Sequence, residues 1–159
     1  MKALVVYYSR TGNTKFVAGK IAQELGADIE EIIDKKNRFG LIGFLLAGVD
    51  AFRGKKTKIA ETKKNPSEFD LIVVGTPNWV ARPSPAVRTY LSKYDLAGKK
   101  VATFCTTDGY SGGEKVIEKI RALIPNSDST EHLVVLKPTE NKADTENKIS
   151  EWCNRLKSL

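Results

Sequence analysis

Residues 9–14 read S-R-T-G-N-T and directly follow the apolar run Ala3–Tyr7. Three hydroxyl groups and one amide are more hydrogen-bonding side chains than an ordinary turn from a strand into a helix requires. A helix that begins here adds unpaired backbone N–H groups and the positive end of its dipole. Gly12 allows the backbone to approach a ligand closely. The stretch therefore predicts a site that holds a phosphate group through hydrogen bonds.

Other phosphate-binding and acidic motifs fit this stretch poorly. A P-loop requires G-x-x-x-x-G-K-[ST], but no glycine stands five residues before Gly12, and the dinucleotide fingerprint G-x-G-x-x-G is absent. A receiver domain has acidic residues at the ends of its first and third strands, where this chain has Tyr8-Ser9 and Thr76-Pro77. The remaining alternative is an ordinary capped turn, for which one hydroxyl group would suffice.

Two later loops add an apolar slot. Residues 75–85, G-T-P-N-W-V-A-R-P-S-P, carry Trp79 on a loop stiffened by prolines. Its indole either stacks on a flat heterocycle or packs on the neighbouring helix. Residues 104–114, F-C-T-T-D-G-Y-S-G-G-E, combine glycines with a second aromatic residue, Tyr110. Together the three loops predict a phosphate cradle at one end of a site and a slot between aromatic rings at the other.

The elements that must position these loops alternate along the chain. Five short apolar segments rich in Val, Ile and Leu predict strands buried on both faces, as in a parallel sheet; they cover Ala3–Tyr7, Asp28–Ile33, Leu71–Val74, Val101–Cys105 and Leu133–Leu136. Helices are expected over residues 13–25, 40–53, 84–93, 113–124 and 140–157. This order predicts an α/β fold, a three-layer sandwich, in one domain spanning residues 1–159. Ligands of such sheets bind at the carboxyl ends of the strands, where the three loops lie.

Capping residues support several helix ends. Ser84-Pro85 places a cap before a first-turn proline, and residues 111–114, S-G-G-E, fit a capping box. Gly26 follows the first helix as a C-terminal stop. The apolar residues 39–53 have basic neighbours and are too short to span a bilayer. We assign them to the crossover helix that the topology needs, with contact to an anionic membrane surface as the alternative.

Composition bounds the function. The formal net charge is +7, yet the lysines are spread along the chain and no nucleic-acid-binding motif is present, so nucleic acid is not an expected partner. The two cysteines, Cys105 and Cys153, and the single histidine, His132, have no metal-ligand spacing. No secretory signal opens the chain and no stable membrane insertion is expected, so we predict a cytoplasmic protein.

At this point the sequence resembles the flavodoxin family over nearly its whole length. S-R-T-G-N-T is similar to the family's phosphate loop [ST]-x-T-G-x-T, and residues 75–88, G-T-P-N-W-V-A-R-P-S-P-A-V-R, are similar to its flavin loop. The resemblance, and not the periodicity, implies a flavodoxin-like sandwich with a five-stranded parallel sheet of order 2-1-3-4-5. The fifth strand leads into its helix without a long insertion, as in the short-chain members.

The resemblance implies FMN as the cofactor and gives each loop a role. Backbone and side chains would hold the phosphate at Ser9, Thr11, Gly12, Asn13 and Thr14, with Arg10 lending its N–H while its side chain faces solvent. One side of the isoalloxazine ring would be lined by Pro77, Asn78, Trp79, Val80 and Ala81. The pyrimidine edge and the other face would be covered by Thr106, Thr107, Asp108, Gly109 and Tyr110, with Gly112 as a further candidate.

The implied function is an FMN-binding electron-transfer protein that shuttles electrons between redox partner proteins. Asp108 is the only acidic residue near the loops and no histidine is close, so a carrier is favoured over an enzyme. The alternative is an FMN-dependent NAD(P)H:quinone-type oxidoreductase. Many flavodoxins are acidic, whereas this chain carries +7. Its redox partner is therefore expected to be acidic, either ferredoxin-like or a reductase.

Overall fold

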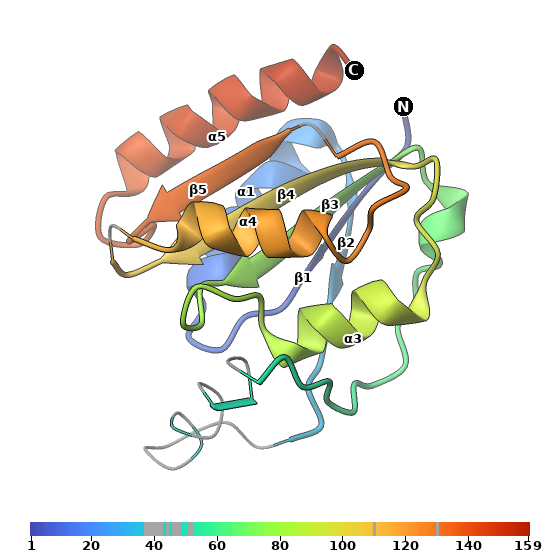
Figure 1. Cartoon of the computed structure of the whole chain (residues 1–159). Helices are drawn as coiled ribbons and strands as arrows, with labels where there is room; N and C mark the ends of the chain where they lie inside the picture. The colour runs from blue at the N-terminus through green and yellow to red at the C-terminus, as the bar shows by residue number, and fades with distance from the viewer. Residues whose placement is uncertain (37–42, 44, 46–48, 51–52, 110, 130) are drawn as a thin grey trace.

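The structure is a computed structural model and describes residues 1–36, 43, 45, 49–50, 53–109, 111–129 and 131–159 (Figure 1). Five strands form one parallel sheet of order β2-β1-β3-β4-β5. The strands are β1 (Ala3–Tyr7), β2 (Asp28–Glu31), β3 (Leu71–Pro77), β4 (Lys100–Thr107) and β5 (His132–Leu136). The described helices are α1 (Asn13–Leu25), α3 (Pro85–Lys93), α4 (Gly113–Arg121) and α5 (Lys142–Lys157), with a 3₁₀ turn at Pro66–Glu68. The predicted fold and strand order are thereby confirmed.

Helices cover both faces of the sheet, so the three central strands, β1, β3 and β4, are buried on both sides. The expectation of burial on both faces is wrong for β2 and β5, which are only partly buried because they lie at the edges of the sheet. Along β1, Leu4 and Val6 point into a core shared with α3 and α4, whereas Val5 and Tyr7 point into a core shared with α1 and α5. This alternation follows from the two-residue period of a strand. Figure 1 shows the resulting layers, with α1 and α5 on one side of the sheet and α3 and α4 on the other.

The apolar faces of α1 and α5 are buried. Val17 and Ile21 of α1 are inaccessible to solvent, and so is Trp152 of α5, the largest of the fully buried side chains. The helix expected over residues 40–53 falls mostly outside the described residues. Within the part of the chain that the structure describes, no helix is long and apolar enough to cross a membrane.

The main differences from the expected strands concern their carboxyl ends. β2 stops at Glu31 instead of Ile33, whereas β3 and β4 continue to Pro77 and Thr107. The longer strands carry the first residues of both later loops, because Thr76 and Thr106 are buried and remain in the hydrogen-bonded ladder. The rigid sheet therefore reaches further into the predicted site than the apolar pattern indicates.

Two of the three helix caps predicted from the sequence are present in the structure. The Ser84 hydroxyl accepts the Val87 N–H at 3.3 Å, with Pro85 in the first turn, and the Gly26 backbone closes α1 on the Ala22 and Gln23 carbonyls. The predicted capping box at residues 111–114 is wrong. The residue before α4 is Gly112, with φ of 91° and no side-chain cap. Glu114 instead pairs with His132, at the start of β5, at 3.0 Å.

The close contact between β3 and β4 gives a test of the packing. Gly75 and Phe104 are register partners, and a Cβ atom on Gly75 would lie 2.1 Å from Phe104 Cζ. Gly75→Ala should therefore lower the free energy of unfolding by about 1–3 kcal/mol through overpacking, measured by urea denaturation. Adding Phe104→Leu should recover part of this loss.

Gly19→Ala is the matched control. Gly19 lies inside α1, and a Cβ atom added there would meet no other atom within 4 Å. The same methyl group should there raise the free energy of unfolding by about 0.5–1 kcal/mol, because alanine favours the helix. Equal effects of the two substitutions would contradict the packing described for Gly75.

Candidate functional site

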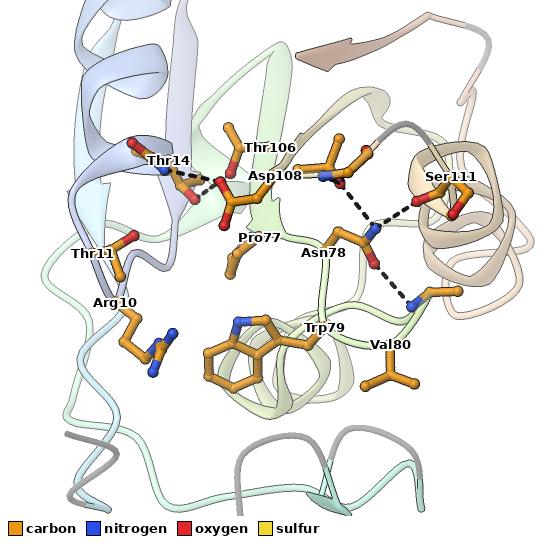
Figure 2. A pocket seen from close by; sticks show the side chains of 15 residues that line it. Arg10, Thr11, Thr14, Pro77, Asn78, Trp79, Val80, Thr106, Asp108 and Ser111 are labelled. Carbon is orange, nitrogen blue, oxygen red and sulfur yellow. Dashed lines mark hydrogen bonds between the residues drawn. The ribbon is translucent and has the colours of Figure 1, made fainter. Parts of the chain in front are cut away.

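A cavity of about 370 Å³ opens at the carboxyl ends of β1, β3 and β4, between the three loops singled out from the sequence (Figure 2). This volume lies in the range of small-molecule and cofactor sites. Its described lining consists of Arg10, Thr11, Asn13, Thr14, Pro77, Asn78, Trp79, Val80, Ala81, Thr106, Thr107, Asp108, Gly109, Ser111 and Gly112.

The structure thus brings nearly all predicted site residues around one space. Ser9 and Gly12 do not line the cavity, and Tyr110 lies outside the described residues. Ser111 lines the cavity although no sequence signal selected it, since its place in the S-G-G-E stretch indicated a helix cap.

The first loop presents an uncapped helix N-terminus. Gly12 precedes α1 with φ of 96° and ψ of −16°, and no side chain caps the first turn. This left-handed conformation strains any residue with a Cβ atom, which accounts for glycine here. The Ser9 hydroxyl accepts the Gly12 N–H at 3.1 Å and closes the loop on itself. The first-turn N–H groups of α1 lack intrahelical partners and are available to an anion.

Side-chain hydrogen bonds join the first loop to the third. The hydroxyl groups of Thr14 and Thr106 lie 2.8 Å apart and are buried. The Asn13 amide donates to Asp108 Oδ1 at 3.4 Å and accepts from the Thr139 hydroxyl at 2.9 Å. Thr139 follows β5, so a fourth loop supports the site. Asn13 is thereby held from two sides.

Asn78 joins the second loop to the third. Its Nδ2 donates to Thr107 Oγ1 at 3.2 Å and to the Ser111 carbonyl at 3.1 Å, as Figure 2 shows. Its Oδ1 accepts the Ala81 N–H at 2.9 Å, and its own N–H donates to the Thr106 carbonyl at 2.8 Å. The side chain predicted to line the flavin therefore also holds the walls of the cavity together.

Trp79 forms an aromatic wall of the cavity. Its ring is half-buried and meets Tyr8 edge to face, with centroids 5.5 Å apart and planes at 85°. The Arg10 guanidinium lies 5.9 Å from the indole centroid, beside it in Figure 2. The Arg10 side chain is thus half-buried against Trp79, and the expectation that it faces solvent is wrong; a cation–π contact accounts for the difference.

Val80 and Ala81 form a strained turn at the margin of the cavity. The N–H and C=O groups of Trp79 and Arg82 bond each other at 3.0 and 3.1 Å, and φ is 54° at Val80 and 55° at Ala81. Such two-residue turns usually contain Asn or Gly, because left-handed backbone costs other residues about 1–2 kcal/mol each. The Lys119 ammonium donates to the Ala81 carbonyl at 2.8 Å and ties α4 to this turn.

The cavity offers little acid–base or nucleophilic chemistry. Among the described residues that line it, Asp108 is the only carboxylate, and neither histidine nor cysteine is present. Cys105 lies just behind Thr106 in β4, but burial, with the Glu114 charge, raises the pKa of its thiol to about 12. That thiol stays protonated at neutral pH. The described residues contain no cluster of metal-ligating side chains.

The flavodoxin family model matches residues 50–156 of this chain. The chain therefore belongs to the flavodoxin family. A search of curated proteins gives no match.

Solved structures share the fold. A flavoprotein from Lactobacillus acidophilus NCFM, solved in complex with FMN, is 22% identical with a TM-score of 0.73, over 87% of this chain and 96% of that one. Oxidised flavodoxin 1 from Bacillus cereus is 22% identical with a TM-score of 0.62, over 100% and 99%. A chain from Bacteroides uniformis reaches a TM-score of 0.77 at 20% identity, over 96% and 97%.

The strained turn yields a stability prediction. Val80 is 61% exposed, so its side chain contributes little burial, while its positive φ penalises a β-branched residue. Val80→Gly should raise the free energy of unfolding by about 0.5–1 kcal/mol, once the greater freedom of glycine in the unfolded chain is included. Urea denaturation measures this change. Val80→Ala keeps the Cβ atom and is the control, and it should raise the free energy of unfolding by less. A loss of stability in Val80→Gly would contradict the strain.

Proposed function

We propose that this protein binds FMN in the cavity and carries electrons between redox partner proteins. The observation that carries the proposal is the pairing of two features across one space: the uncapped N-terminus of α1 and the indole of Trp79. FMN has a matching charged end and flat ring. The family membership and the neighbour solved with FMN agree with this cofactor.

The residues present suit a phosphate dianion. Gly12 needs its left-handed conformation to turn the chain into α1, and the first turn keeps its N–H groups uncapped. Thr11 and Asn13 add polar side chains at the same end of the cavity. The hydrogen-bond donors of this end are thus mainly neutral, which is sufficient at a helix N-terminus.

The second and third loops would hold and cover the isoalloxazine ring. Trp79, Pro77 and Ala81 would line one side, while Thr107 to Gly109 would lie along the other. When bound, FMN supplies one- and two-electron chemistry, and the protein provides binding, orientation and electrostatics. Asn78 would keep the two loops at a fixed separation, because its amide already bonds to both.

A carrier is the function that these side chains support. Asp108 is the only acidic group in the described lining and is engaged by Asn13, so no residue there is placed to handle a substrate proton. A reductant or acceptor would therefore be another redox protein. The net charge of +7 favours an acidic one, ferredoxin-like or a reductase. We place the protein in the cytoplasm, where its two free, buried cysteines stay reduced.

The two halves of the site can be tested separately. Thr11→Val should weaken FMN binding about tenfold or more, because a hydrogen bond to a charged group is lost, but should leave riboflavin binding unchanged. Trp79→Ala should weaken the binding of both ligands about tenfold through lost ring contact. Flavin fluorescence quenching measures each dissociation constant. If Thr11→Val weakened both ligands equally, the phosphate would not lie at the first loop.

A second experiment separates a carrier from an enzyme. The FMN-loaded protein should stay oxidised when NADPH is added anaerobically, and should be bleached once a flavodoxin or ferredoxin reductase is also present. The absorbance near the flavin maximum reports both steps. Rapid bleaching by NADPH alone would instead indicate an oxidoreductase.

A further inference from the structure

The strained turn exposes an apolar side chain beside the cavity. Val80 is 61% exposed, although it also lines the cavity margin. In Figure 2 it projects away from the hydrogen bonds of Asn78, next to Trp79. The turn itself is fixed at its two ends by the Trp79–Arg82 backbone pair and by Lys119. An apolar contact point is thus held rigidly at the opening of the proposed flavin site.

Four cations lie in this turn or on the two helices next to it, α3 and α4. Arg82 closes the turn, Arg88 lies in the first turns of α3, and Lys115 and Lys119 are one turn apart on α4. Their charges act on one another. Burial and then Arg82 lower the pKa of Arg88. Burial, Arg82 and Lys115 lower the pKa of Lys119; Glu118 opposes them, and Arg88 adds a lowering effect smaller than that of Glu118. Val80 and these four residues are called the turn surface below.

Three of the four cations of the turn surface have no carboxylate partner among the described residues. Within the described part of the chain, Arg88, Lys115 and Lys119 form no ion pair with a carboxylate, and Arg88 Nε is buried without a hydrogen-bond partner. By contrast, Lys15 and Lys20 on α1 each pair with a glutamate. Like charges held together raise the free energy of the isolated protein, and an anionic partner relieves that repulsion.

We propose that the turn surface is the docking site for an acidic electron-transfer protein that places carboxylates around its own redox centre. The proposal rests on the proposed function, because docking here would bring the partner's redox centre to the edge of the bound FMN. Val80 would form the apolar centre of the contact and the cations its charged rim, as in other protein interfaces. With a reduced iron–sulfur protein, the cluster loses one electron and the bound FMN gains it.

The test uses a reduced, acidic plant-type [2Fe–2S] ferredoxin as the probe and the FMN-loaded protein as its partner. Stopped-flow spectroscopy gives the second-order rate of flavin reduction, and calorimetry with oxidised ferredoxin gives the dissociation constant. Lys115→Glu should reduce the rate about tenfold at low ionic strength and weaken binding in parallel. The difference from the unmodified protein should vanish in high salt. Lys115 is exposed and does not line the cavity.

Lys63→Glu is the matched control, because it makes the same change in net charge. Lys63 is also exposed, but its backbone N–H donates to Glu30 of β2. β2 forms one edge of the sheet, whereas β4 and β5 lie toward the opposite edge. It should leave rate and affinity close to those of the unmodified protein. Equal effects of Lys63→Glu and Lys115→Glu would overturn the proposal, since net charge alone would then steer the encounter.

Two further results would also overturn it. One is a rate that does not depend on salt in the unmodified protein. The other is saturable inhibition of flavin reduction by millimolar inorganic phosphate at constant ionic strength, which would indicate that the cations form a binding site for a small anion. FMN binding is measured first in every variant. A failure there concerns the proposed function, whereas a failure of docking is seen only in protein that already holds FMN.

Discussion

Parallel pairing of β1, β3 and β4 is the constraint on which the site depends. Tyr7 pairs with Gly75, and Pro77 pairs with Thr106, so the three strands end at the same edge of the sheet. Loops that lie far apart in the chain, at the carboxyl ends of β1 and β3, thereby face one another across the cavity. The contact of Phe104 with Gly75 allows no side chain at Gly75 and helps to fix this register.

The loops hold one another before any ligand binds. Thr14 bonds to Thr106, Asn13 to Asp108, and Asn78 to both Thr107 and the Ser111 backbone. A preformed site loses less conformational freedom on binding than a flexible one, and more of the contact energy then contributes to affinity. Many polar side chains of the site are therefore hydrogen-bonded to other protein groups, whereas the uncapped N–H groups of α1 remain available to the phosphate.

Through local signals the sequence predicted the strands, four helices and the three cavity loops, because buried parallel strands and glycine-bearing loops have strong local patterns. Only through its resemblance to the flavodoxin family did the sequence imply the strand order and nearly all described residues of the cavity. It did not predict what depends on distant contacts. Thr139 reaches Asn13 across 126 positions of the chain, which no local pattern indicates. Val80 and Ala81 adopt left-handed backbone although both residue types prefer negative φ, and their turn is stabilised by hydrogen bonds from or to Asn78 and Lys119. Gly112, not Ser111, precedes α4, because the Asn78 amide holds the Ser111 carbonyl.

The central claim is that FMN binds with its phosphate at α1 and its ring beside Trp79. A titration of FMN into the ¹⁵N-labelled protein, followed by amide and indole NMR signals, tests it most directly. We predict saturable changes that are largest at residues 11–14 and 77–81 and at the Trp79 indole N–H. Changes that do not saturate, or that centre on another part of the molecule, would contradict the account.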